Sequence, residues 1–235
     1  MMQNNVNNTN YVSEFRQDFA IIANWVKFGT KVLDLGCGDG ELLQYLRNSL
    51  EVKGYGVEKD DAKWLACMQN GSNVIQMDLE DGLSGFEDQS FDTVILSQTL
   101  QAMHHTEEIV QEMLRVGREV IVTFPNFGYW RNRLQILTGN MPVSKTLPYQ
   151  WFDTPNVHLC TISDFDQFCK NHNITVLERR VITDTQAVEF MPNLLGNLAM
   201  YRLKASSWIQ QTLLSPPYGN RFSANRRVFY AHHFS

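Results

Sequence analysis

The residues with the clearest chemical potential surround a turn that carries three glycines at alternate positions. The segment KVLDLGCGDGELL spans residues 31–43, and its apolar run at 32–35 indicates a buried strand. Gly36, Gly38 and Gly40 form the turn, and helical spacing follows it. Glycines let a ligand approach the backbone where a Cβ would clash, and a helix N-terminus offers unpaired N–H donors. This order of strand, turn and helix is typical of the start of a nucleotide-binding α/β domain.

The charges around this turn narrow the class of ligand. Asp34, Asp39 and Glu41 crowd it with negative charge, which disfavours a phosphate and suits a cation. The spacing is G-x-G-x-G rather than the dinucleotide G-x-G-x-x-G, and no G-K-[ST] follows, which excludes a P-loop. The pattern D-x-G-x-G-x-G resembles the opening motif of class I S-adenosylmethionine (SAM) methyltransferases, whose ligand carries a sulfonium and an ammonium group. An ordinary glycine turn without a ligand is the alternative.

Two carboxylates follow at the ends of the next two expected strands. Glu58 closes the strand 52–58, where a nucleoside-binding fold places an acid on the ribose hydroxyls. Asp78 directly follows the strand 73–77, where the SAM-binding family places the acid that accepts from the adenine amino group. For either acid alone, a solvated charge at a strand end is the alternative. Their joint occurrence after the glycine turn favours a nucleoside site.

The resemblance to SAM methyltransferases implies a role for each matching position. The turn residues would hold the methionine end of SAM or S-adenosylhomocysteine (SAH), and the residues after the fourth strand would face the methyl group. Lys59 departs from the pattern, because a hydrophobic residue is common there and often packs on adenine. The cofactor-binding residues that the resemblance implies are Asp34, Gly36, Gly38, Gly40, Glu58, Asp78, Ser97 and Gln98.

Other reactive residues give weaker signals. His104 is the one candidate for a general base in methyl transfer, although an exposed loop histidine without a role is the commoner situation. His104-His105 and His158-x-Cys160 lack the three or four ligands of a zinc site, so no metal is expected. Nothing in the sequence indicates a base that would activate Cys160 as a nucleophile. No G-x-S-x-G elbow of a serine hydrolase occurs.

Composition restricts the classes of partner. The chain has 235 residues with 43% hydrophobic and 19% charged residues, as expected for a globular core. Its formal net charge of -5 does not favour a nucleic-acid surface. The start MMQNNVNNTN lacks the features of a signal peptide, and no apolar run reaches the length of a membrane span. The four scattered cysteines indicate reduced thiols in a cytoplasmic protein.

The elements that position these residues alternate between strand and helix. The pattern predicts a Rossmann-like, doubly wound α/β sheet of the class I SAM methyltransferase type, with seven strands and an antiparallel last strand. An amphipathic helix through Phe15, Phe19, Ile22 and Val26 precedes it. The predicted strands are 32–35, 52–58, 73–77, 91–97, 119–124, 174–182 and 198–203. The predicted helices after the glycine turn are 41–46, 62–68, 106–115, 130–137 and 164–170, the last preceded by the capping pattern Thr161-x-x-Asp164.

The predicted domain covers residues 11–204, after a disordered tail at 1–10. An insert at 125–160 is long and rich in aromatic residues, as in functional lids and binding surfaces. We expect its aromatic side chains, with Phe124, to cover the carboxyl ends of the strands, although partner docking or a purely structural role would also account for them. Residues 205–235 contain no Asp or Glu and are interpreted as an appendage rather than a second domain.

Five runs of the sequence carry a further resemblance: residues 31–43, 91–103, 114–135 and 141–165, and PNLLGNLAMYRL at 192–203. With these runs the chain resembles the MetW family of methionine biosynthesis over residues 11–204. This resemblance implies the class I methyltransferase fold and an association with the homoserine O-acyltransferase MetX, which forms O-acetyl- or O-succinylhomoserine. In one hypothesis the protein supports that acyltransferase. In the other it is an active SAM-dependent methyltransferase on a small molecule.

Overall fold

The computed structural model describes residues 17–183 and 186–206. The expected tail at 1–10 lies outside the described residues. So do Phe15 of the predicted first helix and the appendage from residue 207 onward.

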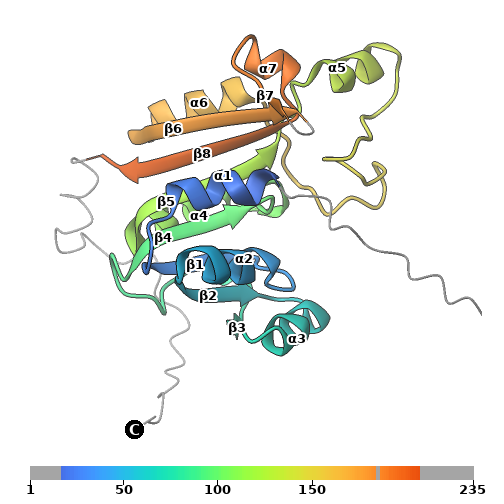
Figure 1. Ribbon diagram of the computed structural model, residues 1–235. Helices are drawn as coiled ribbons and strands as arrows, with labels where there is room; N and C mark the ends of the chain where they lie inside the picture. The colour runs from blue at the N-terminus through green and yellow to red at the C-terminus, as the bar shows by residue number, and fades with distance from the viewer. Residues whose placement is uncertain (1–16, 184–185, 207–235) are drawn as a thin grey trace, which may run out of the picture.

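Across the described residues, one mixed sheet of eight strands has the order β3-β2-β1-β4-β5-β8-β6-β7 (Figure 1). The first five strands are parallel, and β8 runs antiparallel between β5 and β6. The predicted doubly wound sheet with an antiparallel last strand is confirmed, and the two-residue edge strand β7 is additional. The strands are β1 (Lys31–Leu35), β2 (Lys53–Glu58), β3 (Asn73–Gln76), β4 (Phe91–Ser97), β5 (Gly117–Pro125), β6 (Ile174–Thr183), β7 (Gln186–Ala187) and β8 (Leu198–Ala205).

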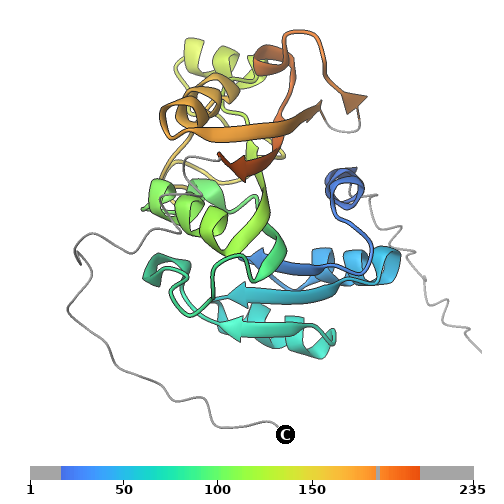
Figure 2. The ribbon, with the colours of Figure 1, turned by 90° about the vertical axis from the view of Figure 1, so that its left-hand side faces the viewer.

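Helices cover both faces of the sheet, as the edge-on view in Figure 2 shows. The helices α1, α2 and α3 lie on one face, and α4 and α6 lie on the other (Figures 1 and 2). All five helices predicted after the glycine turn are present, and α2 continues four residues beyond its predicted end. The helices are α1 (Gln17–Trp25), α2 (Glu41–Leu50), α3 (Asp61–Gln69), α4 (Thr106–Val116), α5 (Trp130–Leu137), α6 (Ile162–Asn171) and α7 (Pro192–Leu195), with short 3₁₀ helices η1 (Leu79–Asp81) and η2 (Leu100–Ala102).

Strand residues alternate between two hydrophobic cores. Val94 and Leu96 of β4 face a core shared with α4 and α6, whereas Ile95 between them faces α1 and α2. Successive side chains on a strand point to opposite faces, so a strand buried on both sides reads as a continuous apolar run. This explains why VIL in β4 and VIV in β5 are apolar without interruption.

The helix start predicted by the capping pattern is confirmed at α6. The Thr161 hydroxyl accepts from the Asp164 backbone N–H, and the Asp164 carboxylate accepts from the Thr161 backbone N–H at 2.9 Å. This reciprocal pair satisfies two N–H groups that a helix N-terminus otherwise leaves unpaired. The helix therefore begins at Ile162, directly after the aromatic insert.

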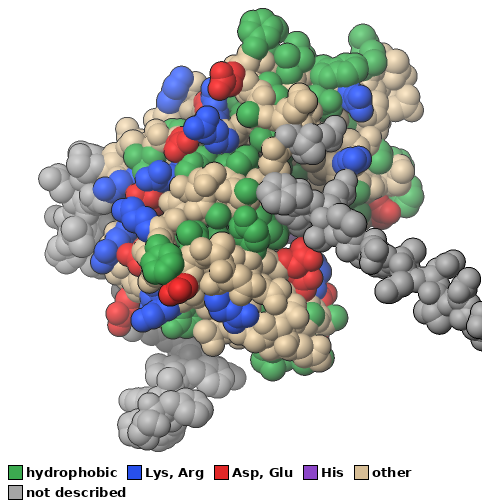
Figure 3. Space-filling model, viewed as in Figure 1, with side chains coloured by type: hydrophobic (Ala, Val, Ile, Leu, Met, Phe, Trp, Pro, Cys, Tyr) green, Lys and Arg blue, Asp and Glu red, His purple; other side chains and the backbone are tan. Residues whose placement is uncertain are grey.

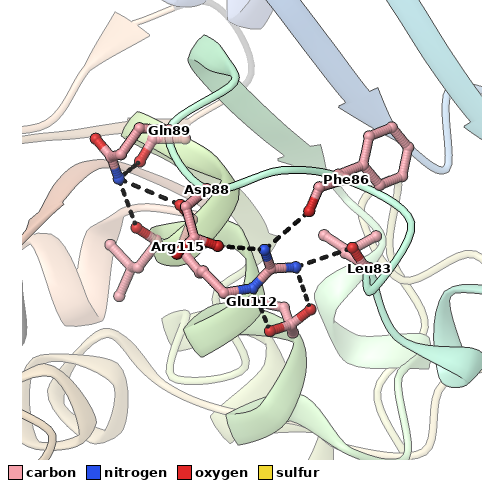
Figure 4. Close-up of polar contacts among 8 residues, drawn as sticks. Leu83, Phe86, Asp88, Gln89, Glu112 and Arg115 are labelled. Carbon is pink, nitrogen blue, oxygen red and sulfur yellow. Dashed lines mark hydrogen bonds and ion pairs between the residues drawn. The ribbon is translucent and has the colours of Figure 1, made fainter. Parts of the chain in front are cut away.

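One arginine fastens the long connection between β3 and β4 to helix α4 (Figure 4). Arg115 donates to the backbone carbonyls of Leu83 and Phe86, each at 2.9 Å. The same guanidinium donates to the carboxylates of Asp88 and Glu112 at 2.7 and 2.8 Å. The planar guanidinium suits such multiple contacts. This connection therefore packs as part of the domain and leads directly into β4.

Candidate nucleoside-binding site

The glycine turn after β1 has a backbone that needs glycine. Gly36, Gly38 and Gly40 have φ values of +71°, +58° and +85°, in the left-handed region that L side chains rarely adopt. The backbone N–H groups of Gly36 and Cys37 both donate to the Val57 carbonyl, at 2.8 and 3.0 Å. The turn is thereby fixed against the end of β2, next to Glu58.

The three glycines differ in what surrounds them. A Cβ on Gly36 would meet the Thr99 hydroxyl at 2.8 Å, and one on Gly40 would meet the Cys67 sulfur at 2.8 Å. A Cβ on Gly38 would have nothing within 4 Å. Gly36 and Gly40 are therefore required for packing, whereas the space beside the Gly38 backbone is open.

Glu58 lies against this open backbone. Its side chain is buried, and its Oε2 accepts from the Gly38 N–H at 2.9 Å. Its Oε1 accepts from the N–H groups of Lys59 and Asp60, each at 2.9 Å. The structure thus joins the predicted ribose acid to the middle of the glycine turn, and three backbone donors fix the direction of its carboxylate.

Asp34 is the least satisfied polar group of the site. It is only 2% exposed, and its Oδ1 atom is buried without a hydrogen-bond partner in the described part of the chain. Burial raises the pKa of Asp34 to about 8, and the nearby Glu58 carboxylate adds to the rise. An unpaired buried acceptor is costly unless a donor reaches it. The ammonium group of SAM would be such a donor, so these residues fit that cofactor.

Asp78 has a different setting from Glu58. Its carboxylate caps η1 by accepting from the Glu80 N–H at 3.1 Å, and it is 3.6 Å from the Lys59 ammonium. The side chains of Lys59 and Asp78 are 67% and 43% exposed. The lysine that departs from the SAM-binding pattern is therefore the ion-pair partner of the predicted adenine acid. Such an exposed pair contributes little to stability and can rearrange around a ligand.

Ser97 is the last residue of β4 and Gln98 follows it, and both form contacts within the protein. The Ser97 hydroxyl is 3.2 Å from that of Thr123, and the Gln98 backbone N–H donates to the Thr123 carbonyl at 3.0 Å. Gln98 has φ +52°, and its side-chain amide donates to Asp18 at 3.3 Å. A left-handed non-glycine residue costs free energy, and such residues cluster at functional sites.

Asp18 and Thr123 were missed from the sequence. Asp18 is buried on α1, and its only signal was an acidic residue within an otherwise apolar helix face. Thr123 gave no signal, because a threonine in an apolar strand also suits an ordinary core.

His104 is exposed, so its surroundings do not resemble those of a buried general base. Its backbone N–H donates to one carboxylate oxygen of Glu80 at 2.7 Å, while the His105 ring contacts the other at 2.9 Å. These contacts of Glu80 connect η1 with the residues that follow η2. The structure does not join His104 to Ser97 or Gln98 through any recorded side-chain contact among the described residues.

Neither a metal nor a reactive cysteine stands out. Within the described segments, no three His, Cys, Asp or Glu side chains gather closely enough to hold a metal. All four cysteines of the sequence are free thiols. Burial raises the pKa of Cys160 to about 12, so it remains protonated at neutral pH.

No helix in residues 17–183 or 186–206 is long and apolar enough to cross a membrane.

The prediction that the aromatic residues from Phe124 onward cover the strand ends is wrong for Phe124. Phe124 packs in the core, and Tyr129 is also buried. Trp151 and Phe152 are 71% and 70% exposed. The insert does contact η2, which follows β4, because the N–H groups of residues 157 and 158 donate to the Gln101 carbonyl at 2.8 and 3.0 Å.

A cavity of about 370 Å³ lies elsewhere, between α1 and the strands β6 and β8. Trp25, Arg180 and Arg202 contribute to its lining, and the residues of the glycine turn do not. It is therefore separate from the predicted cofactor site.

The strand order, with the glycine turn after β1 and the acids at the ends of β2 and β3, defines a protein of the class I SAM methyltransferase fold. A SAM-dependent methyltransferase from Archaeoglobus fulgidus superposes with a TM-score of 0.61 and 14% identity, covering 80% of this chain and 91% of that one. The [4+2]-cyclase SpnF superposes with a TM-score of 0.58 and 16% identity, covering 80% of each chain. The fold therefore also occurs in a protein named for a different reaction.

The family assignment is more specific than the fold assignment. The model of the family described as methionine biosynthesis protein MetW matches residues 16–203, and the chain belongs to this family. The bifunctional methionine biosynthesis protein MetXA/MetW of Rhodopirellula baltica is 39% identical over 160 residues. That match covers 64% of this chain and 26% of the relative, so the chain corresponds to about a quarter of the relative's length.

Gly38 and Gly40 provide a matched pair of substitutions. We expect Gly38→Ala to fold with a loss of about 1–2 kcal/mol from its positive φ, yet to bind SAH roughly tenfold or more weakly, because the methyl group occupies the ligand's approach. Gly40→Ala should lose more stability through its contact with Cys67. Thermal denaturation and calorimetry with SAH measure both effects. SAH binding of wild-type strength in Gly38→Ala would exclude a ligand at this backbone.

Proposed function

We propose that this protein binds SAM or SAH at the glycine turn and acts with a homoserine O-acyltransferase to support the formation of O-acylhomoserine. The observation that carries the partnership is the Rhodopirellula baltica relative, whose name joins MetXA and MetW in one bifunctional chain. The proposal places this protein in the cytoplasm, in keeping with its four free thiols.

The cofactor assignment rests on four groups at or near the carboxyl ends of β1, β2 and β3. The Glu58 carboxylate would accept from the ribose hydroxyls, and the open backbone at Gly38 would lie against the methionine end. The unpaired Oδ1 of Asp34 would accept from the ammonium group. Asp78 would exchange its ion pair with Lys59 for the adenine amino group. Bound SAM would supply an activated methyl group.

The surroundings of the expected methyl position favour an auxiliary role over catalysis. Ser97 and Gln98 are held by Thr123 and Asp18, and neither is an acid–base group at neutral pH. His104, the candidate base, is exposed and stands beside Glu80 rather than beside them. A transfer that requires proton removal would therefore depend on a base carried by the substrate or by water.

The test is an assay of the acyltransferase from the same organism with and without this protein, over a range of SAM concentrations. We expect its activity to rise when the protein is added and to change with SAM concentration. A variant with Glu58→Ala should lose the response to SAM. Identical activity in every combination would refute the proposal.

The alternative function is SAM-dependent methyl transfer to a small molecule, and the intact glycine turn with both acids favours it. Incubation with methyl-labelled SAM and a metabolite extract would then yield a labelled product that Glu58→Ala does not form. If SAM binds but no labelled product forms, methyl transfer is refuted and the auxiliary role is supported.

A further inference from the structure

Exposed apolar side chains are concentrated on one part of the molecule. Of the nineteen large hydrophobic residues that are exposed in the described segments, thirteen lie in residues 130–159 and 190–195. Figure 3 shows such side chains gathered at the upper right, over α7, α5 and the chain after α5. We call these thirteen side chains the insert surface. The most exposed are Leu137, at 83%, and Phe190, at 73%.

The elements that carry this surface are held together by a buried asparagine at the end of β5. The Asn126 side-chain amide donates to the carbonyls of Asn193 and Gly196 in and beside α7, at 3.1 and 2.8 Å. Its Oδ1 accepts from the N–H of Ile162, the first residue of α6, at 3.3 Å. Asn132 of α5 donates to the Asn126 carbonyl at 3.2 Å. The helices α5, α6 and α7 are therefore fixed relative to one another, which lowers the ordering cost for the part of the surface that lies on α5 and α7.

The size of the insert surface exceeds that of an ordinary monomer surface patch. Aromatic side chains bury about 150–250 Å² each, so Trp151 and Phe152, at 71% and 70% exposure, present roughly 200–350 Å² together. With the other eleven side chains the exposed apolar area is on the order of 1,000 Å², whereas the largest patch on a typical monomer is about 300–600 Å². One side of a standard protein interface is about 800 Å². The area is thus sufficient for a stable complex.

Charge distinguishes between possible occupants. Residues 126–160 contain three basic side chains, Arg131, Arg133 and Lys145, and one acidic side chain, Asp153, for a net charge of +2 in a chain of net charge -5. Two copies meeting through this surface would oppose like charges, because a two-fold interface places the same patch on both sides. An apolar surface with an acidic rim on a different protein would complement it.

We propose that the insert surface is the docking site for the homoserine O-acyltransferase, which contacts it through an apolar patch with an acidic rim. The inference rests on the proposed function and assigns the partnership to one face of this chain. The relative whose name joins MetXA and MetW in one chain favours that enzyme as the partner. Because the nucleoside residues lie outside the insert surface, docking and cofactor binding involve separate side chains.

The experiment compares the affinity of the purified acyltransferase from the same organism for wild type and for two variants, Leu137→Glu and the double variant Trp151→Ala/Phe152→Ala. These side chains are highly exposed, so their replacement should preserve folding. Both variants should bind the enzyme at least about tenfold more weakly and bind SAH as wild type does. The control is Phe28→Ala, which removes an aromatic side chain of 66% exposure at the turn after α1 and should change nothing.

The outcomes separate this inference from the proposed function. Wild type that binds the enzyme no better than its variants overturns the docking site and leaves the partnership intact. Wild type that neither binds nor activates the enzyme overturns the proposed function. Sedimentation that shows a dimer in wild type and a monomer in Leu137→Glu, with unchanged affinity for the acyltransferase, assigns the surface to a second copy and overturns the inference.

Discussion

Replacing Glu58 by alanine should lower the affinity for SAH by roughly tenfold or more, because one or two charge-assisted hydrogen bonds of about 1.5–3 kcal/mol each are lost. The same change leaves the N–H groups of Gly38, Lys59 and Asp60 without their acceptor. We therefore also expect a stability loss of about 2–4 kcal/mol. Calorimetry with SAH and denaturant unfolding measure the two effects separately.

Two further variants distinguish ligand contact from structural support. Glu58→Gln keeps the shape of the side chain and one of its two acceptor oxygens but removes the charge, so it should regain part of the stability and little of the affinity. Glu119→Ala removes a carboxylate that accepts from Arg202 at 2.8 Å on β5 and β8. It should lower stability while leaving SAH affinity unchanged. Equal SAH binding by wild type and Glu58→Ala would refute the nucleoside assignment.

Asp34→Asn should make the folded protein more stable at pH 8, which is unusual for a substitution in a binding site. The folded-state pKa of Asp34 is about 8 against an ordinary value of 3.8, because its carboxyl group is fully buried. A raised pKa means that the folded state binds a proton that the unfolded chain releases. The contribution of Asp34 to the free energy of unfolding is fully present below about pH 4. It falls as the pH rises toward 8, by at most on the order of 5 kcal/mol.

The measurement is the melting temperature as a function of pH. The difference between Asp34→Asn and wild type should be small at pH 4, should grow until about pH 8 and should then stay constant. The control Asp39→Asn removes an exposed carboxylate from the same turn and should leave the pH dependence as it is. An Asp34→Asn protein that is less stable than wild type at pH 8 would contradict a buried neutral carboxyl group.

The same group should couple SAH binding to a proton. An ammonium group beside the unpaired Oδ1 of Asp34 favours the ionised carboxylate, so binding at pH 7 should release a proton from it. Calorimetry in two buffers of different ionisation enthalpy measures that release. In Asp34→Asn the release should disappear, together with much of the affinity.

Most of the fold followed from local patterns. The continuous apolar runs at β4 and β5 indicated strands buried on both faces, and α5 was predicted with its observed bounds. The two-residue strand β7 was not predicted, because so short a strand has no periodicity of its own and exists only through its pairing with β6.

The candidate site, like the fold, was predicted from the sequence only in part. The sequence by itself determined the glycine turn and the position of Glu58 beside it, because parallel neighbouring strands bring their carboxyl ends to one edge of the sheet. Only the tertiary structure decided that Asp34 lacks a partner, that Lys59 pairs with Asp78, and that Asp18 reaches Gln98. Those outcomes depend on how closely side chains from distant segments approach and how much water remains between them. Spacing along the chain specifies to which face of a strand a side chain points. How deeply that side chain is buried and which group it pairs with depend on the packed tertiary structure.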